Sequence, residues 1–378
     1  MNDLVSWIHF GDLHISERED AHYGDFLTLI HEANRNMADI DFAVLPGDNA
    51  DNGEEDQYRC VQEALKRVRF PVHAITGDHD VAGGGLELFK KYLELEPYRS
   101  FSRGVYHFVF LNSVAVWNPP VFGLGKEQMR WLRSELTAAV SRGLKSVVFM
   151  HSYPTEHGAE ADSLRCLFGQ NNVLIVEMGH THYNELANDG RTIYAATRST
   201  GQVEEGPPGF SVTTLDGGVV SWKFKSVRQW PLVMITSPAD HRLVADWAGP
   251  RQVVRGKVRV RARIWGPSVE QVTLSINGGD PQAMSMQAGT LWEADWHSNN
   301  GRHTVEVTAR CDDGRTASDR IVVMANQAGH YATPKRNAID YENAVGAWPE
   351  KHILGTQLGP NENGRHWPSK RNKEHSAK

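Results

Sequence analysis

The sequence has little cysteine, no excess of positive charge and no long hydrophobic run. Its 3 cysteines lie far apart and form no CxxC pair, which fits reduced thiols in a cytoplasm better than a disulfide framework. The 40 Lys and Arg residues against 46 Asp and Glu residues give a net charge of -6, so we expect no nucleic-acid polymer as a partner. No apolar run reaches the ~18 residues of a membrane span. We therefore predict a cytoplasmic protein without a membrane span.

Strand-like and helix-like segments alternate over the first 226 residues. Apolar runs that each end in a polar loop predict strands at 4–10, 42–45, 72–75, 106–112, 146–150 and 173–178. Apolar residues spaced three or four apart predict helices at 26–38, 57–68, 86–93 and 126–139. This alternation is typical of a layered α/β domain, which we place at residues 1–226.

The pattern changes after Trp230 to alternating polar and apolar residues, separated by turns such as Asn277-Gly278. This spacing predicts an all-β sandwich, which together with its linker occupies residues 227–326. It resembles, loosely, the immunoglobulin-like modules that are appended to bacterial enzymes. Residues 327–378 are predicted to form a polar C-terminal tail, in which five apolar residues are candidate docking anchors: Trp348, Ile353, Leu354, Leu358 and Trp367.

Five segments share one design, an apolar strand that stops at an Asp or a His. They read FGDLH at 10–14, PGDN at 46–49, TGDHD at 76–80, MHS at 150–152 and GHTH at 179–182. Ligands of α/β sheets gather beyond the carboxyl ends of the strands, so we expect these side chains to meet. Residues two apart in an extended segment point the same way, which lets DLH and HTH each offer two ligands to one volume.

These segments supply seven side chains that can bind metal: Asp12, His14, Asp48, Asp78, His151, His180 and His182. Mixed carboxylate and imidazole ligands suit Mn, Fe, Zn or Co better than Mg or Ca. Seven ligands exceed what one tetrahedral ion uses, whereas two ions about 3.5 to 4 Å apart that share one carboxylate would use them all. The sequence therefore predicts a dinuclear metal site.

In order and spacing, the five segments resemble the motifs DxH, GDxx(D/N), GN(H)(E/D), a strand-ending His and GHxH of the calcineurin-like metallophosphoesterase superfamily. The resemblance covers roughly residues 4–226 and is greatest to the bacterial class III phosphodiesterases, which act on cyclic nucleotides or glycerophosphodiesters. It implies a four-layer αββα sandwich and two divalent or trivalent ions, with Mn or Fe ahead of Zn or Co.

The resemblance also implies a role for each residue of the site. The first metal would be held by Asp12, His14 and His182, and the second by Asp78, His151 and His180, with Asp48 as the bridge. His79 would be the catalytic residue, beside the scissile phosphate, where it stabilises charge or protonates the leaving alkoxide. Four polar residues in or near motif loops are candidate substrate contacts: His22, Asn49, His157 and Arg198.

The implied activity is hydrolysis of a phosphate ester by direct attack of metal-activated water. One departure from the family pattern favours a diester substrate: Asp78 stands where the family has Asn, and its extra negative charge repels a dianionic monoester more than a monoanionic diester. We thus expect a small cyclic nucleotide or glycerophosphodiester-type substrate. The alternatives are a phosphomonoesterase with the same site and a noncatalytic metal-binding scaffold. Homo-oligomerisation is left open.

Overall fold

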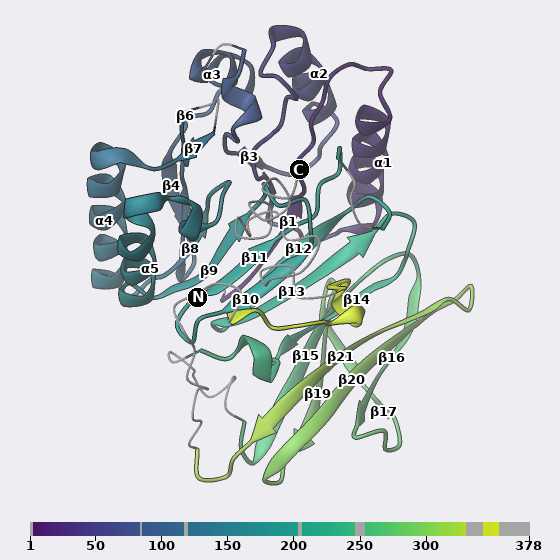
Figure 1. The fold of residues 1–378 in the computed structure, drawn as a ribbon. Helices are drawn as coiled ribbons and strands as arrows, with labels where there is room; N and C mark the ends of the chain where they lie inside the picture. Colours follow the sequence, from purple (N-terminus) through teal and green to yellow (C-terminus); the bar gives the residue numbers. More distant parts are fainter. Residues whose placement is uncertain are drawn as a thin grey trace, which may run out of the picture.

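The computed structural model describes residues 3–83, 85–116, 120–202, 206–245, 254–329 and 343–354. It has a helix-flanked part built from the first 226 residues and a strand-rich part that follows (Figure 1). In these ranges, no helix is long and apolar enough to cross a membrane. All 3 cysteines are free thiols.

Two mixed sheets form the middle of the helix-flanked part. The first, in spatial order, contains β13 (Val219–Ser226), β12 (Gly209–Asp216), β1 (Leu4–Phe10), β2 (Phe42–Leu45) and β3 (Val72–Ala74). The second contains β10 (Glu185–Asn188), β11 (Ile193–Ala196), β9 (Val173–Met178), β8 (Lys145–Phe149), β5 (Tyr106–Phe110) and β4 (Arg99–Arg103). A separate hairpin pairs β6 (Val114–Val116) with β7 (Val121–Phe122).

The two sheets pack face to face through aromatic side chains. Trp7 of β1 stacks on Phe42 of β2 at 5.6 Å between ring centroids. It also meets Phe108 of β5 edge-on at 5.7 Å and Phe149 of β8 at 6.0 Å. These rings are buried, so the strands of both sheets are covered on their inner faces and read as continuous apolar runs.

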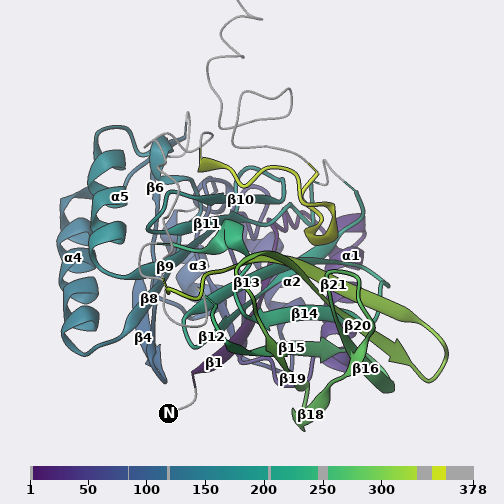
Figure 2. The same cartoon turned by 90° about the horizontal axis from the view of Figure 1, so that it is seen from below.

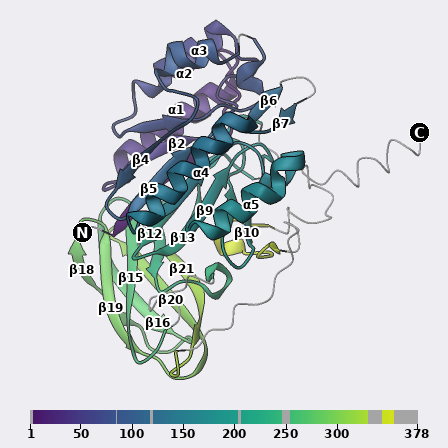
Figure 3. The ribbon, with the colours of Figure 1, turned by 90° about the vertical axis from the view of Figure 1, so that its left-hand side faces the viewer.

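Helices cover the two outer faces, which completes the four layers. The first sheet is flanked by α1 (Ala21–Asn36), α2 (Glu55–Leu65) and α3 (Leu86–Leu93), and the second by α4 (Gly125–Ser141) and α5 (Ala161–Gln170) (Figure 3). Apolar side chains repeat along α1 at helical spacing and pack against Phe10. The predicted four-layer α/β fold is confirmed.

Strand direction brings the polar strand ends together. β1, β2 and β3 are parallel to one another, and so are β5, β8, β9 and β11. Short 3-10 turns lie beyond two of these strands: η1 (His79–Val81) after β3, and η2 (Pro154–Glu156) and η3 (Gly158–Glu160) after β8. The carboxyl ends of the parallel strands thus carry the loops in which the motif residues lie.

The strand-rich part consists of two antiparallel sheets of four strands each (Figure 2). One contains β14 (Leu232–Ser237), β15 (Lys257–Trp265), β19 (Leu291–His297) and β18 (Ser285–Ala288). The other contains β17 (Gln282–Ala283), β16 (Val269–Ile276), β20 (Gly301–Cys311) and β21 (Thr316–Ala325). The strands predicted after Trp230 are present. That this part is an immunoglobulin-like module, and that its boundaries lie at residues 226 and 326, stay predictions.

Buried polar contacts join the two parts. Arg261 of β15 forms an ion pair of 2.6 Å with Asp216 of β12, and Arg263 donates a hydrogen bond of 2.8 Å to Ser6 of β1. A 3-10 turn, η4 (His241–Leu243), follows β14. Such contacts help to fix how the parts pack, because breaking one removes a partner from a polar group in the buried interface.

Much of the predicted tail at 327–378 lies outside the described residues. Within it, residues 343–354, which include η6 (Pro349–Lys351), pack against the folded parts. Of the predicted anchors, Trp348 and Ile353 are buried, Leu354 is exposed, and Leu358 and Trp367 lie outside the described residues. Lys351 forms an ion pair of 2.7 Å with Asp319 of β21.

Candidate metal centre

Each metal-ligand candidate lies just beyond a strand of one of the two packed sheets. The strand ends and their side chains are β1 with Asp12 and His14, β2 with Asp48, β3 with Asp78, β8 with His151, and β9 with His180 and His182. The structure brings all seven together in two groups, within which the ligand atoms lie no more than 4.8 Å apart.

Four of these residues adopt a left-handed backbone conformation that non-glycine residues rarely take. The φ angles are 46° at His14, 50° at Asp48, 67° at His180 and 63° at His182. Each such residue costs about 1 kcal/mol or more, a strain that clusters at functional sites. The loops stay in place because Leu13 and His14 both donate backbone hydrogen bonds to the Asp48 carbonyl, at 3.0 and 2.8 Å.

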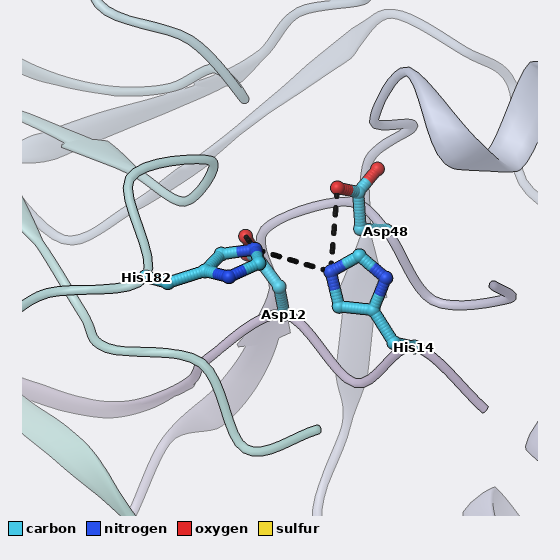
Figure 4. Close-up of side chains that lie close together, drawn as sticks. All are labelled: Asp12, His14, Asp48 and His182. Atoms are coloured by element: carbon cyan, nitrogen blue, oxygen red, sulfur yellow. Dashed lines mark hydrogen bonds and ion pairs between the residues drawn. The ribbon is translucent and has the colours of Figure 1, made fainter. Parts of the chain in front are cut away.

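The first group contains Asp12, His14, Asp48 and His182 (Figure 4). His182 Nε2 lies 3.4 Å from Asp12 Oδ2 and 3.1 Å from His14 Nε2. His14 Nε2 in turn lies 3.6 Å from Asp48 Oδ2. Two imidazole nitrogens and two carboxylates therefore face one small volume.

The second group contains Asp78, His151 and His180, and Asp48 adjoins it. Asp78 Oδ1 lies 3.1 Å from His151 Nε2 and 3.4 Å from His180 Nδ1. Asp48 Oδ2 lies 3.4 Å from His151 Nε2 as well as close to His14 of the first group. One carboxylate oxygen thus faces both groups.

Glycines leave the space in which the Asp and His side chains of the two groups come close together. A side chain at Gly77 would collide with Asp48 Oδ1, and one at Gly179 would collide with Asp12 Oδ1. Gly47, at φ 106°, would place a Cβ at 2.5 Å from His151 Nδ1. The glycines before three of the motif residues are therefore required by close packing around the carboxylates.

Neighbouring charges shift the pKa values of residues in both groups. Burial favours the neutral acid, but His151 outweighs it and holds the pKa of Asp48 below its usual value. Burial likewise opposes charging of His180, but the carboxylates of Glu156 and Asp78 outweigh it and raise the pKa of His180 to about 10. The site therefore holds protons where a cation would sit.

The residues fit metal ions. Asp12 Oδ1 is buried and has no hydrogen-bond partner among the described residues, which is costly unless a cation binds there. The donors are all imidazole nitrogens and carboxylate oxygens, without any thiolate, which suits first-row transition ions. Asp12, His14 and His182 would hold one ion, and Asp78 would hold the other with His151 and His180; Asp48 would contact both.

Asp51 links His14 to His79, a role that the sequence analysis did not assign. Its Oδ1 lies 3.1 Å from His14 Nδ1, and its carbonyl accepts a hydrogen bond of 2.6 Å from His79 Nδ1. A carboxylate behind a metal-binding imidazole fixes the ring and its tautomer. Asp51 is the last residue of the GDxx(D/N) motif, which is the signal that could have identified it.

Glu156 and Phe122 hold His180 in a similar way. Glu156 Oε1 lies 3.3 Å from His180 Nε2, and the Phe122 ring meets the His180 ring edge-on at 4.8 Å between centroids. Neither residue belongs to a motif: Phe122 is the last residue of the short strand β7, and Glu156 is the last residue of η2. No sequence signal pointed to them.

The Asn49 side chain is part of the scaffold beneath the site. It is fully buried, and its amide donates to the Ile75 carbonyl and to Asp80 Oδ2, both at 2.9 Å. Asp80 also accepts from the backbone of Gly77 at 2.9 Å and from the Tyr58 hydroxyl at 2.9 Å. This placement favours a structural role for Asn49 over the predicted substrate contact.

The other three predicted substrate contacts occupy different surroundings. His22 Nδ1 lies 3.1 Å from the His14 carbonyl and is partly exposed, so it borders the first group. His157 is buried, with Nε2 at 3.0 Å from Ser152 Oγ. The Arg198 guanidinium is buried over the Phe224 ring at 4.0 Å and bonds the Pro207 carbonyl, which favours a structural role.

The family model for calcineurin-like phosphoesterases matches residues 6–184. That stretch contains every residue of the two groups and His79. This domain is a calcineurin-like metallophosphoesterase. The resemblance noted from the motifs is confirmed, and the domain is a metal-dependent phosphoester hydrolase.

Several relatives resemble the metallophosphoesterase domain. A probable cyclic nucleotide phosphodiesterase from Fibrobacter succinogenes is 24% identical over 237 residues, covering 56% of this chain and 88% of the relative. A probable glycerophosphodiester phosphodiesterase from Arcobacter nitrofigilis is 26% identical over 178 residues, covering 43% and 64%. A dimetal phosphatase from Danio rerio shares the fold, with a TM-score of 0.50 and 13% identity over 60% of this chain and 97% of that structure.

Proposed function

We propose that this protein is a phosphodiesterase that hydrolyses a small phosphate diester with two metal ions, Mn or Fe ahead of Zn or Co. The observation that carries the proposal is the position of Asp48. Its Oδ2 lies 3.6 Å from His14 Nε2 and 3.4 Å from His151 Nε2, which supports a role for Asp48 as a carboxylate shared by two ions. We propose the seven Asp and His residues of the two groups as the ligands.

When bound, two such ions supply Lewis acidity toward phosphoryl oxygens and lower the pKa of water. The proposed reaction is a direct attack of water on phosphorus, without a covalent enzyme intermediate. His79 is the proposed catalytic residue: its side chain is 30% exposed, and its Nδ1 is engaged by the Asp51 carbonyl. We propose that Nε2, in the doubly protonated ring, stabilises a phosphoryl oxygen or protonates the leaving alkoxide.

The charge around the second group supports a diester. Asp78 contributes a carboxylate where the family has a neutral Asn, and Glu156 adds another at 3.3 Å from His180. Extra negative charge disfavours a dianionic monoester more than a monoanionic diester. The names of the Fibrobacter and Arcobacter relatives support a cyclic nucleotide or a glycerophosphodiester-type substrate. A cytoplasmic location stays a prediction, as does the open question of homo-oligomerisation.

The test compares p-nitrophenyl phosphate with bis(p-nitrophenyl) phosphate on protein whose metal content has been measured. We expect about two ions per chain and faster turnover of the diester. Asp78→Asn should shift the ratio of turnover several-fold toward the monoester, since it removes one charge at coordination distance. A parent that prefers the monoester is a phosphomonoesterase, and one that binds metal but turns over neither ester is a scaffold; either result contradicts the proposal.

A further inference from the structure

A cavity of about 410 Å³ lies where four segments of the chain meet, and none of the metal-centre residues lines it. Its walls come from residues 223–226 of β13, the connection at 228–233, the start of β21 at 316–318, and the C-terminal segment around His352. A cavity of this size accommodates a small molecule.

Buried lysines line one wall. Lys223 and Lys225 are two residues apart on the edge strand β13, so they project from the same face, and both are buried. Lys223 Nζ lies 3.3 Å from Asp319 Oδ1, but the same carboxylate also pairs with Lys351 at 2.7 Å. One negative charge is therefore shared by two ammonium groups.

The positive charge of Lys225 is also only partly balanced by its neighbours. Lys225 Nζ lies 3.8 Å from Glu32 Oε2 and 4.2 Å from the centre of the Trp230 ring. Burial lowers the pKa of Lys225 to about 8 despite Glu32. Burial, followed by the positive charges of Arg198, Lys223 and Lys225, lowers the pKa of His352 to about 4. Of the charged residues that line the cavity, Lys223, Lys225 and Arg228 are cationic and Glu350 is acidic, so positive charge is in excess.

Two further donors at the cavity are available to a ligand. Among the described residues, neither the guanidinium group of exposed Arg228 nor the imidazole of His352 has a hydrogen-bond partner. Both residues have left-handed backbones, with φ of 63° and 60°. Such conformations cost energy in residues other than glycine, and strain of this kind marks binding sites.

We propose that this cavity binds a small phosphate group, with Arg228 and His352 donating hydrogen bonds and Lys223 and Lys225 supplying positive potential. Arg presents the forked donors that match phosphate oxygens. A neutral His352 carries one ring N–H to donate. The site is separate from the metal centre and does not depend on the proposed function.

The test is calorimetric titration of the metal-loaded protein with inorganic phosphate. We expect the parent to bind one more phosphate per chain than Arg228→Glu does. If the variant still binds phosphate at this site, its affinity should be lower by about tenfold or more. His352→Ala should weaken the same site. Arg133→Glu, which reverses an exposed charge on α4, should bind phosphate as the parent does.

Two controls separate this site from the metal centre. Phosphate inhibition of ester hydrolysis should be the same in the parent and in Arg228→Glu. Glycerol 3-phosphate and 5′-AMP, titrated in the same way, distinguish an alcohol phosphate from a nucleotide as the ligand. Calorimetry measures the loss of phosphate binding in Arg228→Glu even if the protein has no hydrolytic activity, so the two proposals can fail separately. Equal stoichiometry and affinity in the parent, Arg228→Glu and His352→Ala would overturn the proposal.

Discussion

Glu156 Oε1 lies 3.3 Å from His180 Nε2, at the far end of the imidazole ring from Asp78, which lies 3.4 Å from Nδ1. A neutral imidazole that donates Nε2–H to a carboxylate presents an unprotonated Nδ1 to a metal ion. Glu156 is therefore placed to orient His180 without itself being a ligand.

Replacing Glu156 should weaken metal binding in the second group. We predict that Glu156→Ala lowers the affinity of one of two Mn²⁺ ions by about tenfold, the usual effect of removing a partner behind a metal-binding His. Glu156→Gln keeps an acceptor oxygen and should retain most of the affinity. Calorimetric titration with Mn²⁺ measures both, with Glu127→Ala on the exposed face of α4 as the control. Unchanged binding in Glu156→Ala would remove this role.

Metal binding should release protons. Glu156 and Asp78 overcome burial to raise the pKa of His180 to about 10, and Asp48 does the same to raise the pKa of His151 well above its usual value. Below these pKa values the metal-free protein carries the protons that a metal must displace. The apparent Mn²⁺ affinity should thus rise between pH 6 and 8, by about tenfold per pH unit for each proton released. Titration in buffers of different ionisation enthalpy counts the protons, and an affinity that falls with pH contradicts the account.

Gly179 should tolerate no side chain. A Cβ there would collide with Asp12 Oδ1, the buried oxygen without a hydrogen-bond partner among the described residues. We predict that Gly179→Ala displaces the Asp12 carboxylate and lowers the metal content from about two ions to about one. Gly24→Ala is a suitable comparison: it also changes a glycine to alanine, but with no atom within 4 Å of the new Cβ. Elemental analysis of both variants is the measurement, and full occupancy in Gly179→Ala would be the adverse result.

Glu177 should make stability depend on pH. It is buried between the sheets, where it accepts a hydrogen bond of 2.8 Å from Trp7 Nε1, and burial raises its pKa to about 7. The folded chain then binds a proton more tightly than the unfolded chain. Its contribution to the free energy of unfolding is fully present below about pH 4.5 and is lost as the pH rises through about 7.

Glu177→Gln cannot ionise and should escape this loss. Relative to the parent, the variant should gain on the order of 2 kcal/mol in the free energy of unfolding between pH 5 and pH 8. Urea denaturation at the two pH values measures the difference, and Glu127→Gln should show none. A gain that is the same at both pH values would mean that Glu177 is already ionised at pH 5.

The sequence predicts the strand ends well because one short pattern carries both fold and chemistry. The runs at 4–10, 42–45 and 173–178 coincide with β1, β2 and β9, since strands buried on both faces are continuously apolar. The sequence does not tell whether a polar side chain near a motif points into the site or into the scaffold, because that depends on tertiary packing. Asn49 belongs to a motif and Arg198 follows β11, yet the side chains of both residues pack into the scaffold.

Two kinds of feature lie beyond the sequence. Lys223 and Lys225 give β13 the alternation of a solvent-facing edge strand, yet both are buried once the strand-rich part packs nearby. Glu156 reaches His180 from a 3-10 turn that has no fixed spacing to any motif. Such contacts arise only when separate loops converge.

The central claim is that two ions share Asp48. Anomalous diffraction at the manganese edge, from crystals grown with Mn²⁺, tests it most directly. The account predicts two peaks about 3.5 to 4 Å apart, one beside His14 and the other beside His151, with the Asp48 carboxylate between them. A single peak, or two peaks of which one lies beyond reach of Asp48, would contradict it.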